Sequence, residues 1–386
     1  MSPRALVLGA LLSVLSGTGF AAGPEKALSG VLEAIEANRL DLATQRVEAL
    51  IAAHPNFRLA HLIRGDLLMA RARPLETFGN VPKTVPREKV EDLRTEALLR
   101  LRALRDRPNG ERVPRHVLQL EPDQRYALLV DSRRSRLYVF ENAGGRPQFI
   151  ADYYVTLGKN GVEKTREGDQ KTPIGVYHVT GNLPRQKLTD FYGAGAFPIN
   201  YPNAWDKRLG RNGHGIWLHG TPSDTYSRPP RASDGCIVLA NADLEAVGPR
   251  LQIGLTPVII ADEIEWIDAG TQERERTGLA AAFEAWRADW ESRNTDKYLA
   301  HYSARFSSGD QDLAAWSDHK RKVNGSKSWI KVGVSRVSML QYPRESFVVV
   351  SFDQDYRSSS LSNAMRKRQY WIKEDGRWRI LYEGGA

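Results

Sequence analysis

Two short motifs hold a histidine and the chain's single cysteine, and together they could cleave an acyl bond. His219-Gly-Thr ends one apolar run, and Ser-Asp-Gly-Cys236 precedes another. A thiol nucleophile needs a base within hydrogen-bond reach, a group that orients the base, and backbone N–H donors for the oxyanion. The chain between the two motifs is long enough to fold back, so the sequence could supply all of these.

The residues beside the two reactive side chains suit the same chemistry. Gly235 leaves the backbone bare beside the sulfur, so the amides of Gly235 and Cys236 could approach a substrate carbonyl, and Gly220 does the same beside His219. A protonated His219 would lower the pKa of the thiol and populate the thiolate. We therefore expect Cys236 as nucleophile and His219 as general base and acid, with Gly235 as oxyanion backbone and Gly220 and Ser233 completing the catalytic motifs.

The lone cysteine also has a second interpretation, as a buried thiol that only packs, because free Cys is a common small core residue. The compartment bears on this choice. Residues 1–22 have the layout of a secretory signal peptide: a basic start, an apolar run and a small-x-small end at Gly19-Phe-Ala21. We expect an exported, periplasmic protein without a transmembrane anchor, in which an unpaired Cys236 is either buried or kept for chemistry.

Composition favours a soluble multidomain protein and excludes other classes. At 386 residues the chain should hold about two to three domains. With 41% hydrophobic and 26% charged residues it is neither a disordered polyanion, a collagen-like repeat nor a polytopic membrane protein. The net charge of +9 favours anionic partners, but no arginine-rich arm or basic helix points to a nucleic acid. The remaining histidines lack metal-ligand spacing, so we expect no metal and no cofactor.

The apolar pattern divides the chain into a helical and a β-rich part. Residues 23–124 read as a helical N-terminal region: apolar positions at steps of three and four predict a helix over 27–53, Pro55 breaks it, and the pattern resumes over 58–71. This hairpin either packs as a core or serves in dimerisation or docking. From residue 125 to 263, short β-branched and aromatic runs predict a mainly-β domain.

The last third of the chain reads as a separate α+β unit. Residues 264–278 are charged and weakly patterned, which predicts a linker. A third domain over 279–386 opens with an amphipathic helix, 279–291, and continues with four strands.

The catalytic motifs resemble the signature of a known family, the L,D-transpeptidase catalytic domain, also called the YkuD domain. That signature is a His-Gly-Thr strand end followed by Ser-x-Gly-Cys-Ile/Val, which this chain has at 219–221 and 233–237. The stretch 171–177 is similar to the family's Thr-Pro-x-Gly-x-Phe strand, and Tyr201-Pro-Asn with Asp206 to a further block. The resemblance covers about 125–262 and implies a YkuD-like fold there.

The resemblance implies a substrate and a reaction. Cys236 would attack the bond between the third residue of a peptidoglycan stem peptide, usually diaminopimelate, and the terminal D-Ala, while His219 would take the thiol proton and return it to the leaving amine. Transfer of the acyl group to a second stem's amine makes a 3-3 cross-link, the activity of an L,D-transpeptidase. Transfer to water trims a tetrapeptide to a tripeptide, which is the alternative activity of an L,D-carboxypeptidase.

Two departures from the family concern the binding of the substrate. Asp234 stands where many members have histidine, and Val238 stands where an arginine is usual. Loop cations could hold a substrate carboxylate instead, although exposed loop charges often serve only solubility. On one strand His214 and His219 would face opposite sides, so His214 is a weaker candidate for the base and is expected to shape the pocket. The candidates for substrate binding are His214, Asp234, Thr221, Arg231 and Tyr201, with Arg228, Lys207 and Arg208 as further loop cations.

The order of the three parts resembles the cell-shape L,D-carboxypeptidases, which end in a nuclear-transport-factor-2-like cone. The aromatic and basic residues of that cone could bind a glycan or peptide, or they could be the aromatic core of a dimer-forming domain, so a homodimer through the terminal domains is expected. A rival of another class is a non-catalytic wall-binding scaffold with a retired site. A papain-type peptidase is disfavoured because His219 precedes Cys236 in the chain.

Overall fold

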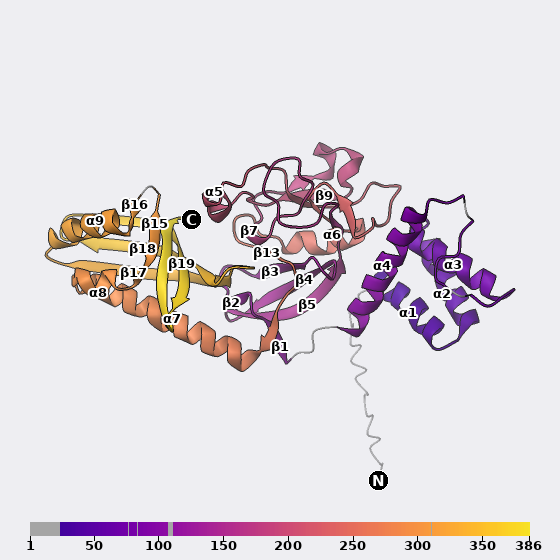
Figure 1. Ribbon diagram of the computed structural model, residues 1–386, viewed down its shortest axis with the longest axis horizontal. Helices are drawn as coiled ribbons and strands as arrows, with labels where there is room; N and C mark the ends of the chain where they lie inside the picture. The colour runs from indigo at the N-terminus through magenta and orange to yellow at the C-terminus, as the bar shows by residue number, and fades with distance from the viewer. Residues whose placement is uncertain (1–23, 76, 83, 107–110, 310) are drawn as a thin grey trace, which may run out of the picture.

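The computed structural model describes residues 24–386 apart from 76, 83, 107–110 and 310. The expected signal peptide of residues 1–22 lies outside the described residues. Three parts follow one another along the long axis of the molecule: a helical N-terminal region, a β-rich centre and a C-terminal α+β part (Figure 1). The predicted fold class is confirmed.

In the described part of the N-terminal region, four helices surround a buried apolar core. The break at Pro55 is confirmed, but the stretch 27–53 is not one helix. The chain turns at 37–39, where Asn38 adopts a left-handed φ of 54°. These helices are α1 (Pro24–Glu36), α2 (Leu40–Ala53), α3 (Arg58–Ala70) and α4 (Arg87–Arg105).

Two sheets build the β-rich centre, and a short strand pair and helices complete it. The larger sheet has the order β5-β4-β3-β13-β7 and the smaller one β12-β10-β9-β8. The larger sheet contains β3 (Tyr126–Asp131), β4 (Arg136–Ala143), β5 (Arg146–Tyr154), β7 (Gly175–His178) and β13 (Pro257–Ala261). The smaller contains β8 (Leu183–Pro184), β9 (Gly195–Pro198), β10 (Trp217–His219) and β12 (Ile237–Val238), while β6 (Leu157–Gly158) pairs with β11 (Arg231–Ser233). The helical elements are α5 (Ala204–Arg208), α6 (Asn241–Val247) and the 3-10 turns η1 (Arg185–Lys187), η2 (Asp190–Tyr192) and η3 (Gly248–Arg250).

One apolar core joins the two sheets of the centre. Leu128 and Val130 of β3 enter it from the larger sheet, and Leu218 of β10 and Ile237 of β12 enter it from the smaller one. All four side chains are fully buried. Because successive side chains of a strand point to opposite faces, this burial fixes which residues of β10 and β12 point away from the core.

The C-terminal part folds a long sheet around aromatic side chains, with α7 lying along it (Figure 1). Trp286 and Trp290 of α7 and Tyr298 of α8 are buried there, which agrees with the expectation of an aromatic core. The helices are α7 (Ala269–Glu291), α8 (Thr295–Leu299) and α9 (Leu313–Gly325). The strands are β15 (Tyr302–Ser308), β16 (Gln311–Asp312), β17 (Ile330–Gln341), β18 (Phe347–Ser358), β19 (Ser362–Glu374) and β20 (Arg377–Gly385).

Two stretches fold differently from the sequence-based expectation. Residues 112–119, which the sequence-based division assigns to the N-terminal region, form β1 (Arg112–Pro114) and β2 (Val117–Gln119), and β2 joins the C-terminal sheet beside β17. The expected linker 264–278 contains β14 (Trp266–Asp268), which pairs with β1, and the first turns of α7. In both cases the partner strand lies far away in the chain, so no local pattern could reveal it.

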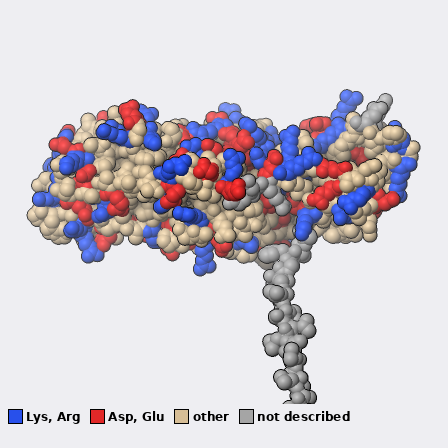
Figure 2. All heavy atoms as spheres, turned by 90° about the horizontal axis from the view of Figure 1, so that it is seen from below, with Lys and Arg blue, Asp and Glu red and all other residues tan. Residues whose placement is uncertain are grey.

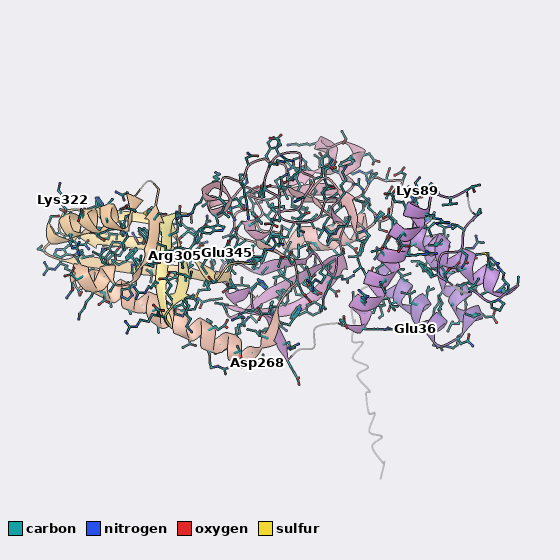
Figure 3. All side chains as sticks on the ribbon, in the orientation of Figure 1. Glu36, Lys89, Asp268, Arg305, Lys322 and Glu345 are labelled. Carbon is teal, nitrogen blue, oxygen red and sulfur yellow. The ribbon has the colours of Figure 1, made fainter. Side chains whose placement is uncertain are left out.

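Polar contacts join the centre to both neighbours. Arg100 of α4 and Arg136 of β4 are buried and both bind the carboxylate of Glu25 in α1. At the other end Trp205 of α5 donates through Nε1 to Glu345 at 3.1 Å. Glu345 lies where the C-terminal part meets the centre (Figure 3).

Basic and acidic side chains share the surface of the molecule. On the face shown in Figure 2, basic and acidic side chains are interspersed over all three parts. Across the described residues, no helix combines the length and apolar character needed to cross a membrane.

Candidate active site

The pairing of β10 with β12 brings the two motifs together. These strands are parallel, with Leu218 opposite Ile237 and His219 opposite Val238. One residue earlier, the backbone N–H of Trp217 donates to the sulfur of Cys236. Since Leu218 and Ile237 point into the core, His219 and Cys236 both lie at positions of the opposite face, as diagonal neighbours across the two strands.

The imidazole of His219 is oriented by the backbone. Its Nδ1 lies 2.7 Å from the carbonyl oxygen of Gly220, so Nδ1 carries the proton and donates it, and the lone pair of Nε2 remains for a substrate or thiol proton. The rings of Tyr192 and Phe191 pack against the imidazole at 5.2 and 5.8 Å between centroids. The group that orients the imidazole is therefore a carbonyl and not a carboxylate.

Asn241, the first residue of α6, holds the strand end that carries His219. Its Oδ1 accepts from the amides of Ala194 and Thr221, and its Nδ2 donates to the carbonyl of Thr221. A Cβ atom on Gly220 would lie 2.1 Å from this Oδ1. The close approach of Asn241 requires glycine at position 220.

Burial makes the resting pair neutral. It raises the pKa of the Cys236 thiol to about 11, against a smaller lowering by the Trp217 N–H, and it lowers the pKa of His219 to about 4. A pKa of about 4 favours a neutral His219 at neutral pH, in contrast to the expected imidazolium, because burial disfavours the charged ring. The thiol proton can instead pass to His219 as the sulfur attacks.

The turn before Cys236 is closed by Ser233. Its hydroxyl donates to the carbonyl of Cys236 at 2.7 Å and accepts from the amide of Gly235 at 3.1 Å. Gly235 has a left-handed φ of 122°, and a Cβ atom there would lie 2.7 Å from the carbonyl oxygen of Lys171. The Gly235 amide is thus engaged, whereas the amide of Cys236 has no acceptor among the described residues and remains available to a ligand.

Two predicted substrate-binding residues lie inside the scaffold. Thr221 is buried and donates its hydroxyl to the carbonyl of Tyr226 at 3.3 Å. Tyr201 is buried too, and its hydroxyl donates to the carbonyl of Asn212 at 3.0 Å. Both side chains hold loops beside the catalytic pair.

The other three predicted binding residues are exposed. His214 precedes β10 instead of lying on it, and its Nε2 is 3.5 Å from the carboxylate of Glu167. Asp234 pairs with Lys159 at 3.0 Å. Arg231, on β11, is exposed beside Gly161.

Two cations, Lys164 and Arg228, affect the cysteine more than the sequence alone indicates. Lys164 is buried, donates to Asp169 at 2.8 Å, and its charge lowers the pKa of Cys236. Arg228 acts on Cys236 in the same sense, and it lies over the ring of Phe191 at 4.7 Å. In the sequence, Arg228 could be suspected only because it lies between the two motifs. Arg231 lies there too, so sequence position alone does not distinguish the two arginines. No metal-ligand group of three or more His, Cys, Asp or Glu side chains occurs in the described part of the chain.

Family models match two of the three parts. Residues 125–260 match the L,D-transpeptidase catalytic domain, and residues 278–384 match the Cds6 C-terminal NTF2-like domain. The fold and the Cys-His site thus define a cysteine-dependent enzyme of L,D-transpeptidase fold that acts on peptidoglycan.

Solved structures are similar over most of the chain. Bd1075 of Bdellovibrio bacteriovorus is 30% identical, with a TM-score of 0.62, over 71% of this chain and 98% of that one. The helical cell shape determining protein Pgp2 of Campylobacter jejuni is 27% identical, with a TM-score of 0.60, over 70% of this chain and 95% of that one. A point mutant of Pgp2 gives 25% identity and a TM-score of 0.61, over 78% of this chain and 100% of that one. The comparison with curated proteins finds no match. The chain belongs to the family of L,D-transpeptidase-fold proteins that carry a C-terminal NTF2-like domain.

Proposed function

We propose that the protein is an exported L,D-carboxypeptidase that removes the terminal D-Ala from peptidoglycan stem tetrapeptides. The observation that supports it is the placement of Cys236 and His219 on one face of the β10–β12 pair, with Nε2 of His219 free to accept the thiol proton. Similarity to a helical cell shape determining protein over most of both chains favours trimming of stem peptides as the outcome.

The reaction follows from the resting state of the pair. Cys236 attacks the carbonyl of the third residue while His219 Nε2 takes the thiol proton, and the amide of Cys236 stabilises the oxyanion. His219 then protonates the leaving amine of D-Ala, which departs and leaves a thioester on Cys236. Water, deprotonated by His219, hydrolyses the thioester and restores the neutral pair.

Transfer to an amine is the second candidate, because the family model that matches the centre describes an L,D-transpeptidase. Both activities share the acyl-enzyme and differ only in the acceptor. Product analysis separates them: purified mature protein is incubated with tetrapeptide muropeptides, and the products are weighed by mass spectrometry. Tripeptide monomers mean hydrolysis, and dimers joined 3-3 mean transfer.

The control for this experiment is Cys236→Ala. We expect the variant to release no D-Ala while it unfolds at the same temperature as the unchanged protein. Equal release by Cys236→Ala would reject the cysteine as nucleophile, and no release by the unchanged protein would support the wall-binding scaffold.

Export and assembly belong to the same proposal. Cleavage of the N-terminal segment near residue 22, read by N-terminal sequencing of protein from the periplasmic fraction, tests export. Sedimentation of the purified chain tests the expected homodimer through the terminal domains.

A further inference from the structure

Arg228 lies beside the catalytic pair in the loop between β10 and β11. Its guanidinium lies 4.7 Å from the centroid of the Phe191 ring, and that ring in turn packs against the imidazole of His219 at 5.8 Å. The planes of Phe191 and His219 differ by only 34°. Guanidinium, phenyl ring and imidazole thus follow one another, and the cation stands next to the site of acyl transfer.

The guanidinium of Arg228 has no ion-pair or hydrogen-bond partner among the described residues, although it is half-buried. Arginines at comparable depth in this chain are paired: Arg211 binds Asp206 at 3.1 Å, and Arg366 binds Asp353 at 2.9 Å. Burial lowers the pKa of Arg228 accordingly, although Arg stays charged at neutral pH. A partly dehydrated cation with five unused donors is costly unless an anion satisfies it.

The backbone of Arg228 is fixed from two sides. The hydroxyls of Tyr154 and Thr156 both donate to its carbonyl oxygen, at 3.0 and 2.9 Å. On the other side, Ser227 donates to Glu96 of α4 at 2.8 Å. The base of the side chain is therefore preorganised, as a binding residue requires.

The neighbouring residue also anchors the loop. The ring of Tyr226 packs on Phe57 of the helical region, with 4.2 Å between centroids. The helical region thus holds the loop that carries Arg228.

We infer that Arg228 binds a carboxylate of the substrate next to the scissile bond, and thereby selects stem peptides in which that carboxylate is free. This inference rests on the proposed function. A guanidinium pairs with a carboxylate through two parallel N–H bonds, which fixes orientation as well as charge. The position after Cys236-Ile holds Val238, which cannot do this.

The other loop cations are less suitable. Arg208 lies over the ring of Trp205, bonds Ser307 of the C-terminal part and so belongs to that junction. Lys207 is exposed on the same short helix, and Arg231 is exposed beside Gly161. Of the four cations, Arg228 is the one that stacks on a ring that contacts His219.

Two carboxylates flank the bond that would be cut, so the experiment uses three synthetic tetrapeptides. One has both carboxylates free, one carries an amide at the C-terminal D-Ala, and one carries an amide at the side-chain carboxylate of diaminopimelate. Release of the terminal residue is followed for the full mature protein and for Arg228→Gln, Arg228→Lys and Arg231→Gln. Arg146→Gln, which removes an exposed guanidinium on β5, serves as the matched control.

We expect Arg228→Gln to raise KM for the free tetrapeptide by about 10- to 100-fold, the worth of a charge-assisted pair, with a much smaller change in kcat. Arg228→Lys should recover part of this loss. The unchanged protein should discriminate against one of the two amides, and Arg228→Gln should lose that discrimination. The amidated peptide that the unchanged protein cleaves poorly identifies which carboxylate is bound.

A direct measurement accompanies the kinetics. In the Cys236→Ala background, calorimetric titration with the free tetrapeptide should show the same weakening of Kd, by about 10- to 100-fold, on adding Arg228→Gln. Circular dichroism and the unfolding temperature check that each variant is folded.

The outcomes separate the two proposals. If Arg228→Gln discriminates between free and amidated peptides as the unchanged protein does, or if Arg231→Gln and not Arg228→Gln removes the discrimination, the role of Arg228 is wrong and the proposed function stands. If the folded, unchanged protein releases nothing from any of the three peptides, the proposed function fails, and the inference falls with it.

Discussion

The hydroxyl of Ser227 donates to the carboxylate of Glu96 at 2.8 Å and so links helix α4 to the loop beside the catalytic pair. Glu96 is fully buried and also pairs with Arg100 at 2.9 Å. The helical region is therefore connected to the loop beside His219 through a buried carboxyl group.

Removal of the Ser227–Glu96 hydrogen bond should weaken both the fold and substrate binding. We expect Ser227→Ala to lower the free energy of unfolding by about 1 kcal/mol, the net worth of one hydrogen bond, and to raise KM severalfold because the backbone of Arg228 loses one anchor. Urea unfolding and steady-state kinetics measure the two effects. Ser223→Ala, which removes an exposed bond to Asp190 in the same loop, should change stability by less than about 0.5 kcal/mol. An unchanged KM in Ser227→Ala would mean that the loop is positioned without α4.

The neutral pair predicts a broad pH profile. Catalysis needs His219 unprotonated and Cys236 protonated, so kcat/KM should fall only below about pH 4 and above about pH 11, where the two groups titrate. Alkylation of Cys236 by iodoacetamide should likewise be slow at neutral pH and rise toward pH 11. Fast labelling at neutral pH would instead reveal a thiolate–imidazolium pair. Because slow labelling is expected of both an active and a retired site, turnover and not labelling distinguishes them.

The buried imidazole should also make stability depend on pH. The pKa of His219 is lowered in the folded state, so as the pH falls below 6.5 the unfolded chain takes up this proton first. The contribution of His219 to the free energy of unfolding is fully present above pH 6.5. It is lost as the pH falls toward 4, by about 3 kcal/mol in all. His178 and His116 titrate in the same direction, so the measurement compares denaturant unfolding of the unchanged protein with His219→Gln. Parallel curves for the two proteins between pH 4 and 6.5 would contradict the assignment.

The turn at Gly235 should tolerate no side chain. Gly235→Ala forces a Cβ atom to within 2.7 Å of the Lys171 carbonyl oxygen at a left-handed φ, and we expect a loss of about 1–3 kcal/mol together with loss of activity. Gly65→Ala is the matched control. This helical glycine has open space around its Cβ position, so the substitution should stabilise the protein by up to about 1 kcal/mol. Thermal unfolding of the two variants should therefore shift in opposite directions.

Sequence reasoning reached the reactive groups but not the residues that position them. Cys236, His219 and Ser233 stand in motifs whose meaning is local. The β10–β12 register sets the two motifs side by side, and Ser233 bonds the carbonyl of Cys236, while the catalytic roles stay predictions. The role of Asn241 could not be read from the chain, since its three bonds reach back to residues 194 and 221. The depth of burial of His219 depends on Tyr192 and Phe191, which come from a distant turn, and so the sign of the pKa shift at the cysteine was missed.

Strand β2 has a consequence for how the chain can be divided. It precedes the enzyme domain in sequence, yet it completes the sheet of the last domain beside β17, while β1 pairs with β14. A fragment that starts at residue 278 would leave the outer edge of β17 without its neighbour, and bare strand edges of this kind favour association between molecules. The C-terminal part is therefore built from two separate stretches of the chain. A recombinant version of it should include residues 112–119, joined to the rest by a designed linker.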